Sequence, residues 1–534
     1  MFRRTSTSAG VALALLLAAG LLAGCSDGGQ SSGAQGSEAV DLTSLQEGIL
    51  GEDTGGEPVE GGQVTMAVFA EPRSLDPTVS IAALSTGGVE MLNIYDSLMR
   101  YDAEAQEFEP RLAKTLETED NRTWTMTLRD DVTFSNGKPL DAAAVQASQT
   151  RYATASAPEA ALWNDNVANV STPDDRTVVY ELKRPWAQFP GILSTGPGMV
   201  VAKESTRGED FTPIGAGPFT LESWDPQEAM VLQPREDYWG GAPNLDSLRF
   251  VYLPNATAAI ESMDGGQVDM IYVREPDQVE EVLSGDAHGY VNFVASGNSA
   301  IINAGKGRPG SDPRVRQAMQ LAINPEIITT RAFRGAEGGT STVFPDYSRW
   351  HSDVDGLDYD PDRAKELLKE AKADGYDGAV EWTDGSDPAS RETALAIKAM
   401  WEAVGFDVDV HIARTTSDQI TKATEQDFDV MAWGFSFREA DPFPKMFATL
   451  HSDGTQTYGG ATSPEMDSLL EEFQVADSLA DQQSIMEQVQ EQVNDDVPFL
   501  SFGAYAEMLS WTEDVHDVVG TVNSMVMFDR AWKG

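Results

Sequence analysis

The chain has 534 residues, of which 41% are hydrophobic and 23% are charged, so it is long enough to fold into several structural units with buried cores. Its 37 lysine and arginine residues stand against 86 aspartate and glutamate residues, and the formal net charge is -49. This balance argues against nucleic acid as a partner, because nucleic-acid binding requires a basic surface. The acidic surface either aids solubility or binds cations.

The first 24 residues have the pattern of an export signal. Arg3 and Arg4 precede an apolar run that is shorter than the roughly 20 residues needed to span a membrane. The run ends in LAGC at 22–25, and Cys25 is the only cysteine, which excludes an intramolecular disulfide. The LAGC run resembles the lipobox of bacterial lipoproteins. This resemblance implies a signal peptide over 1–24, export by the general or the twin-arginine route, and a lipid on Cys25 that holds the protein on the outer face of the cell membrane.

The following segment is predicted to be a flexible tether over 25–61, because glycine, serine and glutamine dominate it. Beyond it, apolar and polar residues alternate as in β-strands over 64–68, 124–128, 178–182, 248–252 and 406–412. Long helical segments are predicted over 314–322, 361–374, 391–403 and 464–494. Asp360 and Gly375 suit the two ends of the second of these. This mixture predicts an α/β body with several lobes.

Residue patterns typical of catalysis or of a metal site are missing from the sequence. Ser436 lies in GFSFR, which lacks the second glycine of a nucleophile elbow. The acidic loop that starts at His351 has a histidine where a calcium loop needs its first acidic ligand. The five histidines show no zinc-hydrolase spacing. Binding is therefore favoured over catalysis, and no cofactor or metal is predicted.

Six motifs occur in a characteristic order between about residue 62 and the C-terminus. They are SLDP at 74–77; YDSL at 95–98 with PRLA at 110–113; WTMTLR at 124–129 with VTF at 132–134 and NGKPL at 136–140; GAGPF at 215–219; YWGG at 238–241; and DPRVRQA at 312–318. Together they resemble the peptide/nickel-type extracellular solute-binding proteins, family 5, of bacterial ABC transporters.

The resemblance implies a large periplasmic-binding-protein-like α/β fold with two lobes joined by crossing strands near 299–304 and 498–502. An extra subdomain would be inserted in the first lobe. The expected boundaries are 62–85, 190–298 and 498–534 for lobe I, 86–189 for the inserted subdomain, and 299–497 for lobe II. Ligand would bind between the lobes, which would close by a hinge motion.

The implied function is that of a lipid-anchored, monomeric substrate-binding component of an ABC importer. Its ligand would be an oligopeptide or a similar small polar solute, and its membrane partner the ABC permease. The tether would raise the effective concentration of the receptor near that permease. Two alternatives stay open: a lipoprotein receptor or chaperone on the same fold without a transporter, and a surface hydrolase.

The identity of the ligand depends on one loop. In peptide-binding members, the aspartate of a W-x-x-D motif pairs with the α-amine of the ligand, but here Ser436 stands at that position after Trp433. Glu439 or Asp441 could supply the charge, or the ligand has no free amine there. Arg438 would then meet an anionic group or point to solvent. The predicted ligand-binding residues are Ile81, Ala82, Asn303, Trp433, Phe435, Ser436, Asp441 and Phe502; the aromatic ones could instead pack in the core.

Overall fold

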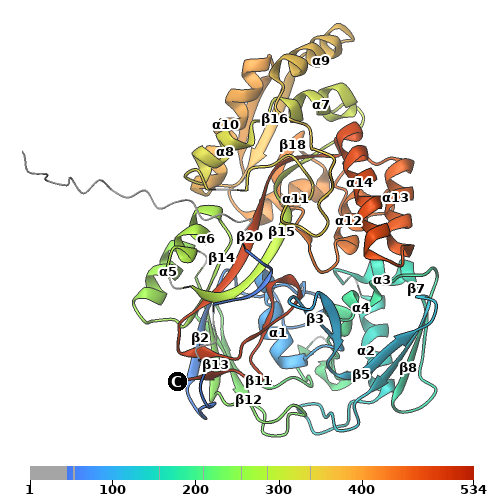
Figure 1. Cartoon of the computed structure of the whole chain (residues 1–534), viewed down its shortest axis with the longest axis vertical. Coiled ribbons are helices and arrows are strands. Elements are labelled where there is room, and N and C mark those ends of the chain that lie inside the picture. The colour runs from blue at the N-terminus through green and yellow to red at the C-terminus, as the bar shows by residue number, and fades with distance from the viewer. Residues whose placement is uncertain are drawn as a thin grey trace, which may run out of the picture. The chain divides into compact units, whose positions relative to one another are not determined.

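The computed structural model describes residues 45–534 except 52–54, 156, 209, 254, 286 and 337. The predicted signal peptide, Cys25 and the first part of the predicted tether lie outside the described residues. The described residues belong to one compact unit, which is built on a sheet of twelve strands and a separate sheet of four. Figure 1 shows their arrangement. None of the helices in the described ranges is long and apolar enough to cross a membrane.

The large sheet extends through two lobes. Its strand order is β11-β12-β13-β2-β14-β20-β15-β18-β16-β17. We call the part with β2 and β11–β14 lobe I and the part with β16–β18 lobe II. The bounds are β11 Phe219–Asp225, β12 Ala229–Pro234, β13 Ser247–Tyr252, β2 Gln63–Val68, β14 Met270–Val273, β20 Phe499–Trp511, β15 His288–Ile302, β18 Val430–Trp433, β16 Ala379–Asp384 and β17 Asp407–Ile412.

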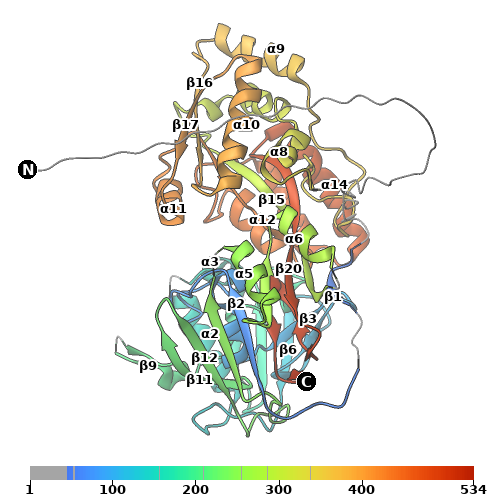
Figure 2. The same ribbon diagram turned by 90° about the vertical axis from the view of Figure 1, so that its left-hand side faces the viewer.

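Strands β15 and β20 connect the lobes. They pair antiparallel from His288↔Trp511 to Ile301↔Phe499. Figures 1 and 2 show both strands running from one lobe into the other. The α/β fold with two lobes and crossing strands is therefore confirmed.

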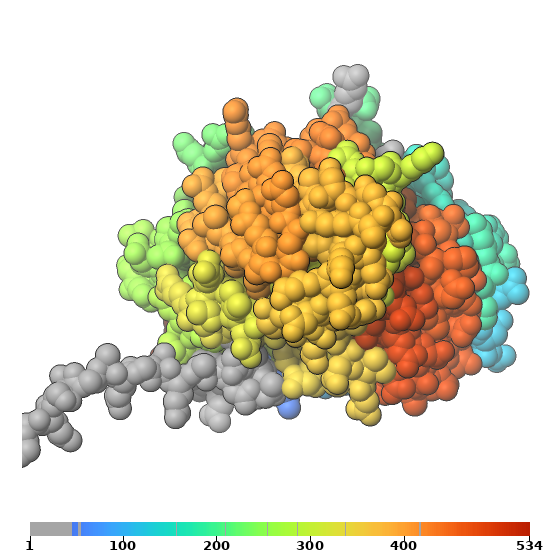
Figure 3. Space-filling view, turned by 90° about the horizontal axis from the view of Figure 1, so that it is seen from above, coloured from blue at the N-terminus to red at the C-terminus, as the bar shows by residue number. Residues whose placement is uncertain are grey.

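Helices cover the sheet in both lobes. Lobe I has α1 Gly88–Tyr95, α5 Ala256–Asp264 and α6 Pro276–Leu283. Lobe II has α7 Pro313–Leu321, α8 Pro325–Ala332, α9 Pro361–Ala373, α10 Pro388–Val404, α11 Thr416–Glu425, α12 Phe443–Leu450, α13 Pro464–Val475 and α14 Leu479–Asp496. Figure 3 shows the surface of this lobe from above.

The inserted subdomain is built on the four-stranded sheet β5-β6-β8-β7. Its elements are β5 Ala113–Thr118, β6 Thr123–Leu128, β7 Val167–Ser171, β8 Thr177–Leu182, α2 Ala142–Thr154, α3 Ala160–Asn166 and α4 Phe189–Ile192, preceded by the hairpin β3 Met99–Asp102 and β4 Glu107–Pro110. Three further short pairs are β9 Thr206–Arg207 with β10 Asp210–Phe211, β21 Val515–His516 with β24 Trp532–Lys533, and β22 Val519–Gly520 with β23 Val526–Met527.

Local sequence patterns predicted many of these elements. The five predicted strands are confirmed as β2, β6, β8, β13 and β17. Asp360 caps α9 by accepting a hydrogen bond from the backbone N–H of Arg363 at 2.9 Å. The segment 464–494 differs, because it forms two helices rather than one. Ser478 accepts a hydrogen bond from the N–H of Asp481 at 3.1 Å and so caps a new helix, α14.

Part of the predicted tether is ordered on the crossing strand. Strand β1, Gly48–Leu50, pairs antiparallel with β15. Leu45 and Leu50 pack against an apolar cluster of lobe I, and Glu47 hydrogen-bonds to Asn292 of β15. Burial raises the pKa of Glu47 well above its ordinary value. These contacts hold the segment against β15, although its composition predicts a flexible tether.

A glutamate is buried in helix α1. Glu90 is 0% exposed, and neither of its carboxylate oxygens has a hydrogen-bond partner in another residue. Burial raises the pKa of Glu90 from 4.5 to about 7, and a hydrogen bond from its own backbone offsets only part of this shift. Glu90 therefore lowers the stability of the folded state once it ionises.

We expect Glu90→Gln to stabilise the protein at alkaline pH and to have little effect below pH 4. As pH rises from the pKa of Glu90 in the unfolded state to its pKa in the folded state, the free energy of unfolding of the wild type falls. The fall reaches about 3 kcal/mol above pH 7. The variant lacks this loss. Urea unfolding at pH 4, 6 and 8 measures the difference. Glu119→Gln, at an exposed position, controls for the removed charge. A difference that does not grow with pH would contradict the expectation.

Candidate functional site

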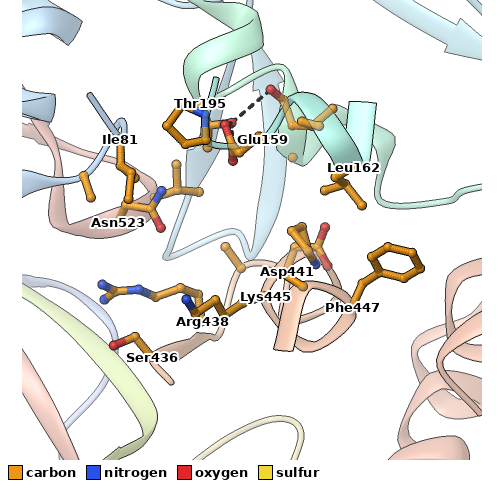
Figure 4. A pocket seen from close by; sticks show the side chains of 18 of the residues that line it. Ile81, Glu159, Leu162, Thr195, Ser436, Arg438, Asp441, Lys445, Phe447 and Asn523 are labelled. Carbon is orange, nitrogen blue, oxygen red and sulfur yellow. Dashed lines mark hydrogen bonds between the residues drawn. The ribbon is translucent and has the colours of Figure 1, made fainter. Parts of the chain in front are cut away.

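A cavity of about 220 Å³ lies between the two lobes (Figure 4). One wall comes from lobe I and its inserted subdomain, including Ile81, Glu159 and Thr195. The other comes from lobe II, including Ser436 and Lys445. The site is thus assembled from segments far apart in the sequence, as is typical of pockets between lobes.

The lobe II wall begins with the short strand β19, Phe437–Arg438, which pairs with Val294 and Ala295 of β15. Ser436, the residue before β19, has a left-handed backbone with a φ of 56° rather than an extended one. Phe435 and Phe437 pack into the core, and the ring centroids of Phe435 and Phe499 lie 4.5 Å apart. Ser436 and Arg438 line the cavity instead. This alternation determines which residues of the loop a ligand can reach.

Arg438 does not point to solvent, and that expectation is wrong. Its side chain is 16% exposed and donates to Glu507 of β20 at 2.7 Å and to Asn292 of β15 at 3.3 Å. Burial by itself would raise the pKa of Glu507, but the Arg438 charge holds it below its ordinary value. The charge of Arg438 is therefore neutralised within the protein.

Of the two candidate acids of the loop, only Asp441 lines the cavity. Glu439 is 7% exposed and accepts a hydrogen bond from the N–H of Arg349 at 3.2 Å. Asp441 Oδ1 accepts from the N–H of Phe443 at 3.0 Å. Asp441 Oδ2 is buried beside Gly191 of the inserted subdomain and has no hydrogen-bond partner among the described residues. Burial raises the pKa of Asp441 to about 7.

Two further charged residues line the cavity from opposite sides (Figure 4). Lys445 of α12 donates from Nζ to Gln456 Oε1 at 2.5 Å, and burial lowers its pKa to about 8. Glu159 accepts from the hydroxyls of Thr195 at 2.9 Å and Tyr152 at 3.3 Å, and burial raises its pKa to about 7. Sequence reasoning missed Lys445 and Glu159, because neither belongs to a motif.

The predicted ligand-binding residues divide into two groups. Ile81, Ser436 and Asp441 line the cavity. Ala82 is buried behind it, where its carbonyl accepts a hydrogen bond at 2.9 Å from the side chain of Asn523, a cavity residue.

The other four predicted residues lie outside the cavity lining. Asn303 is buried and donates to the carbonyls of Gln426 and Phe428, so it holds a turn. Phe502 packs near Trp382 in the core of lobe II, and Phe435 packs in the core as described above. Trp433 is partly buried and lies edge-on to Tyr458 at 5.3 Å. The described ranges contain no group of three or more His, Cys, Asp or Glu side chains placed to hold a metal ion.

We expect Arg438→Met to destabilise the fold by about 3–5 kcal/mol, because it leaves Glu507 buried without its partner. The double variant Arg438→Met/Glu507→Gln should recover part of this loss. Urea unfolding of both single variants and the double variant gives the coupling energy. Arg363→Met breaks an exposed pair with Glu366 and should cost less than about 1 kcal/mol. Equal losses from Arg438→Met and Arg363→Met would argue against a structural role for the Arg438 pair.

Comparison with known proteins agrees with this architecture. Residues 107–457 match the family model described as bacterial extracellular solute-binding proteins, family 5 Middle. The chain is 23% identical over 466 residues to the dipeptide-binding protein of Escherichia coli K12, covering 80% of this chain and 86% of that protein. It is 25% identical over 447 residues to the nickel-binding periplasmic protein of the same organism, covering 78% and 84%.

A solved structure shows the same fold. It is that of the dipeptide-binding protein from Pseudoalteromonas sp. SM9913 in complex with Met-Leu, which has a TM-score of 0.76 and 20% identity, covering 89% of this chain and 100% of that one. Because the family model matches more than half of the sequence, the chain belongs to the bacterial extracellular solute-binding proteins of family 5.

Proposed function

We propose that this chain is the lipid-anchored substrate-binding component of an ABC importer and that it carries out no reaction. It binds an oligopeptide or a similar small polar solute in the cavity between the lobes. The observation that carries the proposal is the cavity itself, whose walls come from two lobes joined by β15 and β20. The relatives named as dipeptide-binding and nickel-binding proteins support a receptor role.

The cavity chemistry favours a polar solute with apolar parts. Hydrogen-bonding groups of Ser436, Gln456 and Glu159 line it together with the apolar side chains of Leu162 and Phe447. Peptides combine backbone polar groups and apolar side chains in the same way. Of the predicted ligand-binding residues, Ile81, Ser436 and Asp441 are those we propose to contact the solute, with Ala82 behind them.

Hinge closure is the proposed binding movement. The inserted subdomain meets lobe II outside the cavity, where Arg184 donates to Glu471 at 2.8 Å and the rings of Trp186 and Phe443 lie 5.6 Å apart. Such contacts form only when the lobes approach each other, and β15 and β20 are the strands about which they would rotate. We propose the lobe boundaries predicted from the sequence, shifted so that α1 belongs to lobe I and α4 to the inserted subdomain.

Anchoring follows from the N-terminal pattern. The LAGC run at 22–25 supports a lipid on Cys25 after removal of 1–24, with the tether holding a monomeric receptor at the outer face of the cell membrane beside its permease.

Native mass spectrometry of the purified protein, followed by titration with a peptide panel, tests the proposed ligand class. We expect the protein to retain a small solute and to bind peptides with a dissociation constant in the micromolar range or below. Tryptophan fluorescence and isothermal titration calorimetry measure the affinity. Absence of binding to every peptide, together with a retained solute of another class, would overturn the peptide assignment.

Gly191 provides a test of closure. A Cβ atom at this position would lie 3.1 Å from Phe108 and 3.3 Å from Asp441 Oδ2 on the opposite lobe. Gly191→Val should therefore keep the lobes apart and weaken peptide binding roughly tenfold or more, since overpacking costs about 1–3 kcal/mol. The radius of gyration with saturating peptide should exceed that of the wild type in small-angle X-ray scattering.

The control for this prediction is Gly285→Val, at an exposed glycine where the nearest atom would lie at an ordinary 3.6 Å. It should bind like the wild type. Urea unfolding shows whether either valine disturbs the fold itself. If Gly191→Val binds peptide as tightly as the wild type, closure onto Gly191 is not part of binding.

A further inference from the structure

The cavity contains a lysine that pairs with no carboxylate in the described part of the chain. Lys445 lies in the first turn of α12, and among the described residues it forms no ion pair. Its ammonium group donates a hydrogen bond to the neutral Oε1 of Gln456. The other nearby cation, Arg438, is already bound to Glu507. Asp441 lies one helical turn before Lys445, but its oxygens are directed to the N–H of Phe443 and towards Gly191.

An ammonium group in this environment lacks stabilisation. Burial, with a smaller contribution from the charge of Arg438, lowers the pKa of Lys445 to about 8, so the group is still mainly protonated at pH 7. A partly buried cation without a counter-ion is costly, and a negatively charged group that enters the cavity would remove this cost. The position therefore favours an anionic ligand group.

The surroundings of Lys445 match a carboxylate in particular. Gln456 uses its Oε1 to accept from Lys445, which leaves its amide N–H groups and two Nζ hydrogens available to a ligand. Thr455, also in the cavity lining, adds a hydroxyl group. Charge-assisted hydrogen bonds from such a set of donors to a carboxylate are stronger than bonds between neutral groups.

The wall formed by the inserted subdomain carries an acidic residue in place of a lysine. Glu159 faces the lobe II wall across the cavity, held by the hydroxyls of Thr195 and Tyr152, and Leu162 lies beside it (Figure 4). The ionised fraction of Glu159, whose pKa is about 7, would repel a carboxylate of the ligand from this wall and favour its binding at Lys445. Asp441 and Asp453 also line the lobe II side, so the feature that distinguishes this side for a ligand carboxylate is the ammonium group of Lys445.

We propose that Lys445, together with Gln456, binds the terminal carboxylate of the solute and is the residue that makes the receptor select ligands with a free carboxylate. This inference rests on the proposed function, because it assigns one end of a peptide or peptide-like solute to a particular residue. It also gives the ligand an orientation, with its carboxylate on α12 and its other end towards Glu159.

Matched pairs of acids and amides test the assignment. The probes are Met-Leu, trialanine and the C-terminal amide of each, titrated at pH 7 by isothermal titration calorimetry. We expect the wild type to bind each acid at least tenfold more tightly than its amide. In Lys445→Met this ratio should fall to near one, while the affinity for the amides stays within about threefold. Lys445→Arg should keep the preference for the acid.

Lys365→Met, which removes an exposed lysine of α9, is the matched control and should retain the wild-type ratio. A second readout separates ligand contact from a structural role. At pH 8.5, carboxylate binding should draw a proton onto Lys445, so the heat of binding should depend on the ionisation enthalpy of the buffer in the wild type but not in Lys445→Met.

The outcomes distinguish this inference from the proposed function. Equal binding of acid and amide by the wild type, or an unchanged ratio in Lys445→Met, overturns the role of Lys445 and leaves peptide binding in place. Failure of the wild type to bind any of the four probes, or any other peptide, overturns the proposed peptide ligand and this inference with it.

Discussion

The antiparallel pairing of β15 with β20 is the constraint on which the rest of the structure depends. The two strands belong to both lobes, so every element of either lobe is positioned with respect to them. Their register is regular from His288 to Val294 and shifts between Val294 and Ser299, where Ser296 has a positive φ of 49°. Such irregularities bend a strand and increase its twist. The pair is therefore a regular ladder within each lobe and is interrupted at the level where the lobes meet.

The edge of β15 that does not pair with β20 links these two crossing strands to the cavity. Strands β1, β19 and β18 each pair with a different part of that edge. Arg438 of β19 contacts Asn292 and Glu507, which are themselves cross-strand partners in β15 and β20. The buried ion pair thus holds the cavity loop to both crossing strands. This use of Arg438 explains why the most conspicuous cation of the loop is not free for a ligand, and why a different residue has to bind any anionic group.

The sequence predicted correctly those elements whose conformation depends on residues close together in the chain. The strands follow from alternation, and Asp360 identifies the start of α9 because an aspartate at that position can cap the helix. Prediction from the sequence failed for elements whose conformation depends on tertiary contacts. An example is β1, whose residues form a strand because they pair with the exposed edge of β15. The site shows the same limit. Glu159 and Lys445 lie in different parts of the chain, and only the approach of the inserted subdomain to α12 brings them to one cavity. The predicted aromatic residues show the same limit, because Phe435 lies in the core while its neighbour Ser436 lines the cavity.

The strongly acidic composition and the single free lysine of the cavity are compatible because they act over different distances. A net charge of -49 repels an anionic solute at long range, but salt screens exposed charges beyond about 8 Å at physiological ionic strength. Inside the cavity, screening is weak and the effective dielectric constant is lower, so one nearby ammonium outweighs many distant surface carboxylates. The acidic surface can therefore serve solubility without preventing capture of a carboxylate. Recognition of the solute is then decided by contacts of Lys445 and Gln456, within hydrogen-bonding distance, rather than by the field of the whole protein.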